Sequence, residues 1–259
     1  MIKEVVCRAA IEQETQPDGP SVPVVDAYDG CQLRCPYCFQ WQDPSWNQDI
    51  LVKTNLPEVL AEQLDGWDTA DPIYVGSRGD PYMALEQRYR LTRRTLQVLR
   101  GKGVPCFLST KSNEQPLFDD LRLFVDYGEH LTICMGQSNL AHFRKTTEPS
   151  ALPNILMANE LLRLGVRTQV FITPVLPGIT DVKAMIHALP PNAPVYLDKL
   201  RLPSGSAAEQ RFFGYLLSYH PHLESRYREL ARDGKDPYYE ELRALCDDDP
   251  RVRYVFGEH

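Results

Sequence analysis

The most informative stretch of this sequence is Tyr28-Asp29-Gly30-Cys31-Gln32-Leu33-Arg34-Cys35-Pro36-Tyr37-Cys38-Phe39. Its cysteines, Cys31, Cys35 and Cys38, have the spacing C-x3-C-x2-C. Cysteine thiolates hold the irons of a four-iron four-sulfur cluster, so three clustered thiolates without a fourth leave one iron open. An open iron can bind a substrate or a cofactor. The spacing therefore predicts a 4Fe-4S cluster with these three cysteines as its ligands.

Structural zinc and a disulfide framework are the alternative interpretations. Zinc normally takes four ligands from paired clusters, but no second pair follows Cys38, and His130 and His142 lie far along the chain without that pattern. The remaining cysteines are widely spread: Cys7, Cys106, Cys134 and Cys246. Because the total of 7 cysteines is odd, we expect reduced thiols rather than disulfides.

Length and composition favour one large domain. With 259 residues, 43% of them hydrophobic, the chain can fill a single substantial core. No apolar run approaches the roughly 20 residues of a membrane span, and the N-terminus lacks a secretory signal, so we expect a cytoplasmic protein without a membrane segment. The net charge of -7 disfavours a general nucleic-acid binder, which normally has a basic footprint.

Short apolar or β-branched runs alternate with amphipathic helical stretches along most of the chain. We expect strands at 22–25, 73–75, 104–109, 131–135, 167–172 and 195–197. We expect helices at 57–64, 85–99, 117–127, 153–164 and 181–188. This alternation predicts an α/β fold with a parallel sheet and right-handed crossovers. From residue 206 onward the pattern predicts helices and a last strand or extended segment at 252–256, packed on the rest of the chain.

The segment 27–39 resembles the cluster loop of radical S-adenosylmethionine enzymes, specifically that of the spore photoproduct lyase-like branch. Further segments similar to that branch follow in the same order: Gly79-Asp80-Pro81-Tyr82, Glu86, Tyr89-Arg90-Leu91-Thr92, Leu96, Ser109-Thr110-Lys111-Ser112, Glu148-Pro149, 174–181 and 200–203. The resemblance covers residues 22–203. It implies a partial (β/α)6 TIM barrel over residues 1–205, with a C-terminal helical extension over 206–259. In such a barrel the cluster and cofactor lie at the C-terminal ends of the strands.

The resemblance also implies an activity. Enzymes of this family reductively cleave S-adenosylmethionine to a 5′-deoxyadenosyl radical, which abstracts hydrogen from a substrate. The implied cofactors are a 4Fe-4S cluster and S-adenosylmethionine, which carry the difficult chemistry. The implied reducing partner is a protein such as flavodoxin or ferredoxin. Whether the net reaction is that of a lyase, a transferase or an oxidoreductase stays open.

Polar residues near the expected strand ends are candidates for binding S-adenosylmethionine. Lys111 can bind the carboxylate of the cofactor, and Ser77 and Asp80 can accept from its ammonium group. Gly76 and Gly79 let the backbone approach closely. By similarity to the family, the adenine is expected to lie against Tyr37, Phe39, Val175, Ile179 and Leu200. The ordinary alternatives are a solvated loop lysine, a turn aspartate before a proline and apolar core residues.

Cys134 is a candidate catalytic residue. Period-two alternation in residues 131–135 puts Thr132 and Cys134 on one face of the expected strand, which we expect to face the barrel interior. A thiol near a carbon radical could return a hydrogen atom, as a cysteine does in the lyase for which the branch is named. The alternative is that Cys134 packs as a small hydrophobic residue. The chain departs from the branch at Phe39-Gln40, where the branch has tyrosine-alanine.

The substrate is the least determined property. Basic residues gather on the second expected helix and just after it: Arg88, Arg90, Arg93, Arg94, Arg100 and Lys102. In a barrel this helix belongs to the outer ring, so a solvated face is the favoured interpretation and a DNA photoproduct lyase-like repair role is the alternative. We therefore expect a small-molecule, nucleotide or peptide substrate. A rival of another class is an iron-sulfur electron carrier or sensor, which needs no cofactor-binding residues.

Overall fold

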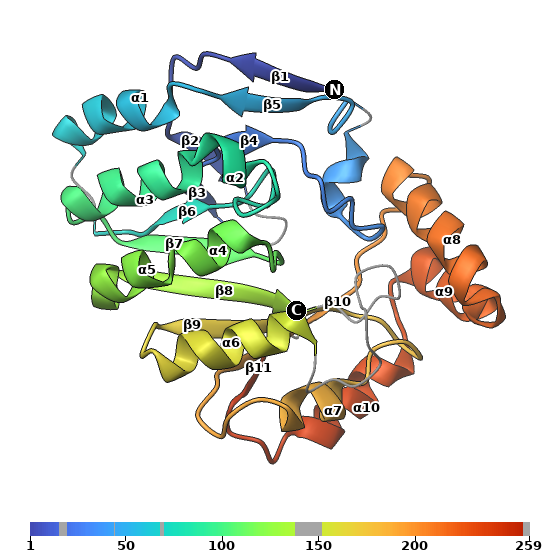
Figure 1. The fold of residues 1–259 in the computed structure, drawn as a ribbon. Coiled ribbons are helices and arrows are strands. Elements are labelled where there is room, and N and C mark those ends of the chain that lie inside the picture. The colour runs from blue at the N-terminus through green and yellow to red at the C-terminus, as the bar shows by residue number, and fades with distance from the viewer. Residues whose placement is uncertain (16–19, 44, 68–69, 138–151, 256–259) are drawn as a thin grey trace. The chain divides into compact units, whose positions relative to one another are not determined.

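The computed structural model describes residues 1–259 except 16–19, 44, 68–69, 138–151 and 256–259. Figure 1 shows the helices and strands along the chain. The chain forms two compact units, each of which combines segments distant in the sequence. Unit 1 consists of Met1–Leu33, Asn47–Met135 and Glu160–Thr168. Unit 2 consists of Arg34–Trp46, Gly136–Asn159 and Gln169–His259. The expected division at residues 205 and 206 stays a prediction.

The main sheet of unit 1 has the strand order β2-β3-β6-β7-β8. Its strands are β2 (Glu12–Thr15), β3 (Ser21–Val25), β6 (Ile73–Val75), β7 (Cys106–Thr110) and β8 (Leu131–Gln137). Strand β2 runs antiparallel to β3, whereas β3, β6, β7 and β8 are parallel neighbours. Parallel strands are buried on both faces, which explains why their sequences are almost continuously apolar. The four strands expected in this region are confirmed, with shifted ends.

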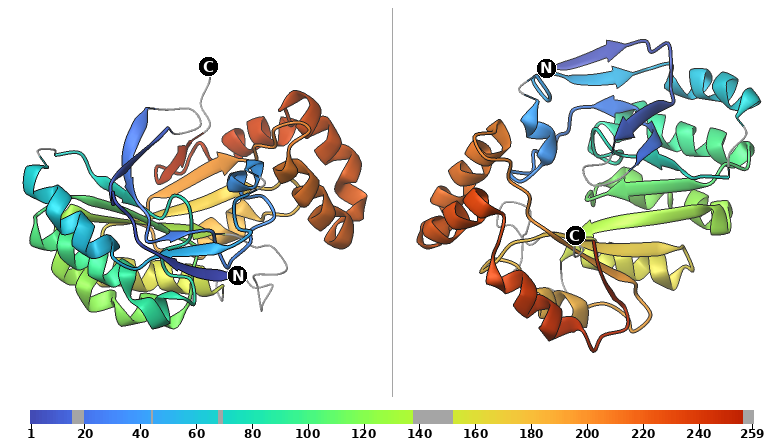
Figure 2. Two further views of the ribbon diagram at one scale, coloured as in Figure 1. Left: turned by 90° about the horizontal axis from the view of Figure 1, so that it is seen from above. Right: turned by 180° about the vertical axis from the view of Figure 1, so that it is seen from behind.

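A smaller sheet of unit 1 was not predicted from the sequence. It has the order β1-β5-β4 and consists of β1 (Ile2–Val5), β5 (Ile50–Lys53) and β4 (Tyr28–Asp29). Figure 2 shows β1 and β5 extended side by side. Strands β1, β2 and β4 are short, and β1 and β2 are mostly exposed, so they lack the apolar runs by which the other strands are recognised.

The helices expected at 85–99 and 117–127 are each divided in two. The helices of this region are α1 (Leu56–Gln63), α2 (Glu86–Tyr89), α3 (Leu91–Gly101), α4 (Gln115–Asp119), α5 (Leu121–Tyr127) and α6 (Pro153–Arg163). Arg90 interrupts the first with a left-handed φ of 53°. The buried Glu86 carboxylate then accepts from the backbone N–H groups of Thr92 (3.1 Å) and Arg93 (3.0 Å) at the start of α3. The Glu86 carboxylate therefore caps the first N–H groups of α3, and the left-handed Arg90 separates the two helices.

Unit 2 is built on three parallel strands, β9 (Thr168–Val175), β10 (Val195–Lys199) and β11 (Val252–Tyr254). Its other elements include the 3-10 helices η1 (Phe39–Gln42) and η5 (Pro221–Leu223) and the helices α7 (Val182–His187), α8 (Ala207–Tyr219), α9 (Glu224–Asp233) and α10 (Pro237–Cys246). The hydroxyl of Tyr239 on α10 donates to the Val175 carbonyl at 3.0 Å and accepts from the Leu200 N–H at 3.0 Å. The C-terminal region is thus bonded to the ends of β9 and β10. The expected last strand is confirmed at β11.

Among the described residues, no helix is both long enough and apolar enough to cross a membrane.

Candidate functional site

The start of the cysteine loop is fixed by Asn47. Its side-chain oxygen accepts from the Cys31 N–H at 2.9 Å, and its amide group donates to the Cys31 carbonyl at 2.9 Å. Gly30 precedes this contact with φ +99°, and a Cβ placed there would stand 2.9 Å from the Asp49 carbonyl oxygen. Only glycine fits this conformation without strain. The backbone at Cys31 therefore has a defined position within unit 1.

The rest of the cysteine loop belongs to unit 2 and is held by η1 and α8. The Cys38 N–H donates to the Cys35 carbonyl at 3.2 Å, and the Trp41 indole N–H donates to the same carbonyl at 2.9 Å. The Arg211 guanidinium of α8 lies 3.9 Å from the centre of a Trp41 ring. Figures 1 and 2 show α8 beside η1. The turn from Cys35 to Cys38 is thus supported by residues that directly follow the motif and by one from the C-terminal region.

The three thiols fit an iron-sulfur cluster in type and number. The seven cysteines, all within the described part of the chain, form no disulfide. Cys31 and Cys35 are buried and Cys38 is half-buried. Within the described ranges, no three His, Cys, Asp or Glu side chains are already converged as a metal site. The cluster therefore stays a prediction that rests on thiol chemistry and spacing.

A buried carboxylate that was not predicted from the sequence holds the loop after β6. Asp26 Oδ1 accepts from the N–H groups of Gly76 (3.1 Å) and Ser77 (2.8 Å), and Oδ2 accepts from the Arg78 N–H (3.2 Å). Burial raises the pKa of Asp26 to about 7, although these backbone hydrogen bonds act to lower it. A signal was present in the sequence: Asp26 directly follows the expected strand at 22–25, where a barrel enzyme places its site.

Two further side chains of the same loop also have partners. The Ser77 hydroxyl donates to the Glu14 carboxylate, and Arg78 Nε lies 3.0 Å from the Asp29 carboxylate. Neither Glu14 nor Asp29 was predicted as a site residue. Ser77 was predicted to accept from the cofactor's ammonium group. Its predicted role stays untested.

Asp80 bonds the loop after β6 to the end of β7. Its Oδ2 accepts from the Lys111 N–H at 2.6 Å, and its Oδ1 accepts from the Thr110 hydroxyl at 2.8 Å and the Tyr82 N–H at 2.9 Å. Asp80 is buried, and burial raises its pKa while these hydrogen bonds act to lower it. The structure thus brings together two predicted cofactor residues, Asp80 and Lys111. Their contact with a cofactor stays a prediction.

Two glycines of the loop after β6 lie directly against other backbone segments, one at the cysteine loop and one at the end of β7. A Cβ on Gly79 would stand 2.4 Å from the carbonyl oxygen of Gly30. A Cβ on Gly76, which has φ +98°, would stand 2.4 Å from the Ser109 carbonyl oxygen. Both approaches exclude any larger residue unless the backbone moves. The glycine pattern seen in the sequence therefore reflects backbone contacts among the end of β7, the loop after β6 and the residue before Cys31.

Cys134 lies beside hydroxyl groups of neighbouring strands. It pairs in register with Ser109 of β7, whose side chain acts to lower the pKa of both Cys134 and Tyr74. Tyr74 stacks on Phe107 with ring centres 5.4 Å apart. Cys134 is 5% exposed, and burial raises its pKa to about 12, so its thiol stays protonated at neutral pH. The catalytic role of Cys134 stays a prediction.

The predicted adenine contacts all belong to unit 2. Val175 and Leu200 are buried, and Tyr239 bonds to the backbone of both. Tyr37 is also buried, Ile179 is half-buried, and Phe39 is 44% exposed. Hydrogen bonds of Tyr239 on α10 therefore link the backbone of Val175 to that of Leu200. The Glu148-Pro149 segment of the resemblance lies outside the described residues.

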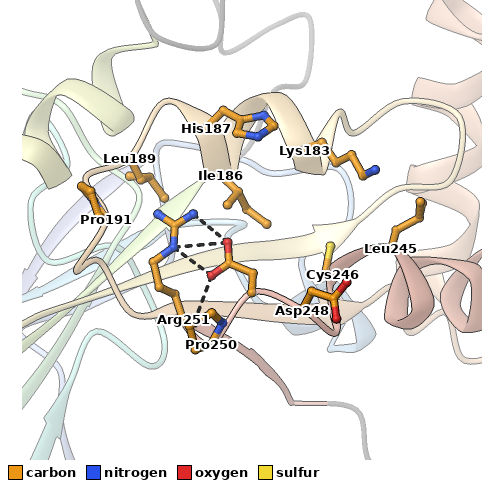
Figure 3. Close-up of a pocket in the computed structure, with 11 residues that line it drawn as sticks. Lys183, Ile186, His187, Leu189, Pro191, Leu245, Cys246, Asp248, Pro250 and Arg251 are labelled. Carbon is orange, nitrogen blue, oxygen red and sulfur yellow. Dashed lines mark hydrogen bonds and ion pairs between the residues drawn. The ribbon is translucent and has the colours of Figure 1, made fainter.

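A surface hollow of about 590 Å³ lies elsewhere in unit 2, between α7 and the segment around β11 (Figure 3). Lys183 and His187 lie on one side and Arg251 lies on the other. Arg251 pairs at 2.7 Å with Asp249, which also lines the hollow. None of the predicted site residues lines it. The hollow mixes both charges with apolar side chains and identifies no ligand class.

The basic residues of α2 and α3 are largely neutralised by acidic partners. The ion pairs are Arg88–Glu4, Arg90–Asp119, Arg93–Asp120, Arg94–Glu58 and Lys102–Asp65. Arg100 donates to the Asp126 carbonyl at 3.0 Å. A phosphate-binding surface needs cations available to phosphate groups, so this face lacks the usual footprint of a nucleic-acid binder.

Relatives in sequence cover most of the chain. An uncharacterized protein of Mycobacterium tuberculosis (strain ATCC 25618 / H37Rv) is 26% identical over 263 residues, which cover 92% of this chain and 76% of the relative. An uncharacterized protein of Methanocaldococcus jannaschii is 28% identical over 182 residues, which cover 67% of this chain and 68% of the relative. No family model matches the chain.

Two solved structures share its fold. Spore photoproduct lyase complexed with dinucleoside spore photoproduct has a TM-score of 0.60 and 11% identity, covering 98% of this chain and 82% of the lyase. Streptococcus suis SuiB bound to precursor peptide SuiA has a TM-score of 0.53 and 12% identity, covering 91% of this chain and 48% of SuiB. The predicted α/β fold is confirmed by both. This chain therefore has the partial-barrel fold of spore photoproduct lyase, as its resemblance to that branch of radical S-adenosylmethionine enzymes implied.

Proposed function

We propose that this protein is a radical S-adenosylmethionine enzyme that abstracts hydrogen from a small-molecule, nucleotide or peptide substrate. The observation that carries the proposal is a C-x3-C-x2-C loop whose start is fixed by Asn47 and touched by Gly79, in a chain with the fold of spore photoproduct lyase. A spore photoproduct lyase variant has been solved with bound AdoMet. The rival hypothesis, an iron-sulfur electron carrier, does not explain the buried polar network around Gly76–Asp80.

The residues of this chain have separate roles in the proposal. Cys31, Cys35 and Cys38 would hold three irons of a 4Fe-4S cluster. When bound, the cluster and S-adenosylmethionine supply a one-electron reductive cleavage that yields methionine and a 5′-deoxyadenosyl radical. Lys111 would bind the cofactor's carboxylate, and Ser77 would accept from its ammonium group.

Asp80 has a role of its own in the proposal. Its two oxygens already accept three protein hydrogen bonds. It therefore acts chiefly by holding Lys111 in place. Gly76 lets the backbone approach the cofactor. Apolar contacts to the adenine come from Tyr37, Phe39, Val175, Ile179 and Leu200.

The choice of substrate class follows from two observations. The relatives by fold are solved with a dinucleoside photoproduct and with a precursor peptide, so the fold accommodates both kinds of ligand. The arginine-rich face of α2 and α3 is paired with carboxylates, which disfavours a duplex-gripping surface there. We propose a cytoplasmic enzyme reduced by a flavodoxin or ferredoxin.

The test is anaerobic reconstitution with iron and sulfide, then reduction by dithionite with S-adenosylmethionine present. We expect 5′-deoxyadenosine and methionine, and neither from a Cys38→Ala variant treated identically. An electron carrier would take up the electron and leave S-adenosylmethionine intact. A fully loaded and reduced protein that neither binds nor cleaves S-adenosylmethionine would contradict the proposal.

A further inference from the structure

Three consecutive backbone N–H groups converge on one buried side chain in unit 1. The N–H groups of Gly76, Ser77 and Arg78 all donate to the Asp26 carboxylate, at 3.1, 2.8 and 3.2 Å. Successive N–H groups that point to one side form a concave site for an anion. Here the anion belongs to the chain itself, at the end of β3, about fifty residues before the loop. The shape of the loop therefore depends on a distant side chain.

A carboxylate suits this position better than any side chain of similar size. It has two oxygens that only accept when ionised, so all three N–H groups are satisfied. An asparagine would place an NH2 group where one oxygen stands, and one backbone N–H would face a donor. A buried donor without an acceptor is costly. Asp26 is 5% exposed, so water cannot replace the lost acceptor freely.

The surroundings of Asp26 bear on its ionisation. Burial is the main cause of its raised pKa; the Glu14 carboxylate also raises it, whereas the Lys53 ammonium and the N–H groups of Ser77 and Arg78 lower it. Tyr74 lies within electrostatic range, and Arg78 is paired with Asp29. With a pKa of about 7, Asp26 loses its charge as the pH falls below neutrality.

The loop that Asp26 holds leads directly to the proposed cofactor residues. Gly76 contacts the end of β7 and Gly79 contacts Gly30, so the loop fits closely between two other backbones. Asp80, at the far end of the loop, bonds to the Lys111 N–H. A shift of the Gly76–Arg78 backbone would move Ser77 and Asp80 together.

We infer that Asp26 is a positioning residue for S-adenosylmethionine: its carboxylate fixes the Gly76–Arg78 backbone and thereby places Ser77 and Asp80. The inference rests on the proposed function for the identity of the ligand. The hydrogen bonding of the loop to Asp26 does not depend on the proposed function. The two parts are therefore tested separately.

The first test needs no cofactor. Hydrogen–deuterium exchange of the loop peptide is measured in wild type, Asp26→Asn and the matched control Glu86→Gln, all at the same pH. Glu86 is also a buried carboxylate that accepts two backbone N–H groups, but those belong to α3. We expect the Gly76–Arg78 amides to exchange about tenfold faster or more in Asp26→Asn and at the wild-type rate in Glu86→Gln. Unchanged exchange in Asp26→Asn would overturn the inference.

The second test measures S-adenosylmethionine affinity on the reconstituted protein between pH 6 and 8.5. We expect Asp26→Asn to keep its iron and to bind roughly tenfold more weakly at pH 8, because a charged acceptor is lost. The ratio of the two affinities should shrink towards one as the pH falls to 6, where wild-type Asp26, with a pKa of about 7, is mostly neutral. The ionisation of the ligand is common to both proteins and cancels in the ratio. An equal ratio at every pH would reject the role of the charge.

Failure of the two proposals can be told apart. If reconstituted wild type binds no S-adenosylmethionine, the proposed function fails, while the exchange result still decides whether Asp26 holds the loop. If wild type binds the cofactor and Asp26→Asn binds equally well, the inference fails and the proposed function survives. Should Asp26→Asn not fold, Asp26→Glu keeps the charge and shifts its position by one methylene. Wild-type exchange and affinity in Asp26→Glu would then overturn the inference.

Discussion

Two charged regions of unit 1 use the same side-chain types in opposite ways. The strand-end region comprises Asp26, the loop Gly76–Tyr82 and Lys111, and its carboxylates are buried, with Asp26 5% and Asp80 8% exposed. The arginine face comprises the basic residues of α2 and α3 and Lys102. Most of its pairs are open to solvent: in the Arg94–Glu58 pair the two side chains are 41% and 58% exposed, whereas the Asp120 partner of Arg93 is buried.

The difference teaches where a substitution will matter. In the strand-end region the carboxylates accept from backbone N–H groups, and removing an acceptor leaves buried donors unsatisfied, at about 1–3 kcal/mol each. On the arginine face the exposed pairs, such as Arg94–Glu58 and Lys102–Asp65, are screened by water, and such pairs contribute about 0–1 kcal/mol. Residues needed for function, and substitutions that lower stability most, should therefore concentrate at the strand ends. The predictions below test this contrast, from the largest expected effect to the smallest.

The largest effect is expected at the cysteine loop that adjoins the strand-end region. Replacing Cys31, Cys35 or Cys38 by alanine should remove most bound iron and the absorption near about 400 nm that such clusters show. Replacing Cys7 or Cys246 should leave both unchanged. Iron analysis and visible spectra after reconstitution provide the measurement. Full iron retention in all three loop variants would reject the cluster, and loss in a control would indicate a fourth protein ligand.

The second contrast compares two glycines. A Cβ on Gly79 would stand 2.4 Å from the Gly30 carbonyl oxygen, whereas a Cβ on Gly101, in α3, meets nothing within 4 Å. We expect Gly79→Ala to lower the free energy of unfolding by about 1–3 kcal/mol through overpacking. Gly101→Ala should be neutral or stabilising by up to about 1 kcal/mol, because alanine favours helix. Denaturant unfolding measures both. Equal stabilities would mean that the close approach at Gly79 is not rigid.

The third contrast compares two lysines. Lys111→Ala should weaken S-adenosylmethionine affinity by about tenfold or more, since a charge-assisted hydrogen bond contributes about 1.5–3 kcal/mol. Lys102, paired with the exposed Asp65, serves as the control, and Lys102→Ala should bind as wild type. Titration of the reconstituted proteins gives the affinities. Wild-type affinity in Lys111→Ala would show that another group holds the carboxylate.

The fourth prediction separates chemistry from packing at Cys134. Serine nearly preserves the volume of cysteine, but its O–H bond is much harder to break homolytically. If Cys134 only packs, Cys134→Ser should give the wild-type product and the wild-type incorporation of deuterium from deuterated water. This is the result that we expect, because Cys134 is buried beside Ser109. A hydrogen-donating thiol would instead make the serine variant fail as alanine does. Both variants should still cleave S-adenosylmethionine, because donation follows radical formation.

The smallest effect is expected on the arginine face. Arg94→Ala breaks one exposed ion pair and should change the free energy of unfolding by less than about 0.5 kcal/mol. S-adenosylmethionine affinity should not change. The same unfolding and titration measurements apply. A loss above about 1 kcal/mol would mean that this face is more tightly organised than its exposure indicates, and would weaken the contrast between the two regions.

The sequence alone determined the elements that have a local signature. The spacing of Cys31, Cys35 and Cys38 identified the candidate cluster loop, and apolar runs located all six expected strands, because buried parallel strands are recognisable from a few adjacent residues. Asp80 and Lys111 were recognised as neighbours of strand ends. The basic character of α3 was also visible, and its outer position followed from the expected barrel order.

Only the tertiary structure decided which distant groups meet. Strands β1, β2 and β4 are too short or too polar to show a pattern, and they exist because other strands bond to them. The capping of α3 depends on the Glu86 carboxylate, and the pairing of Arg94 depends on Glu58 of α1. The role of Asp26 required three N–H groups from residues 76–78. Hydrogen-bond partners far apart in the chain leave no periodic trace in the sequence, so folding has to bring them together before they can be recognised.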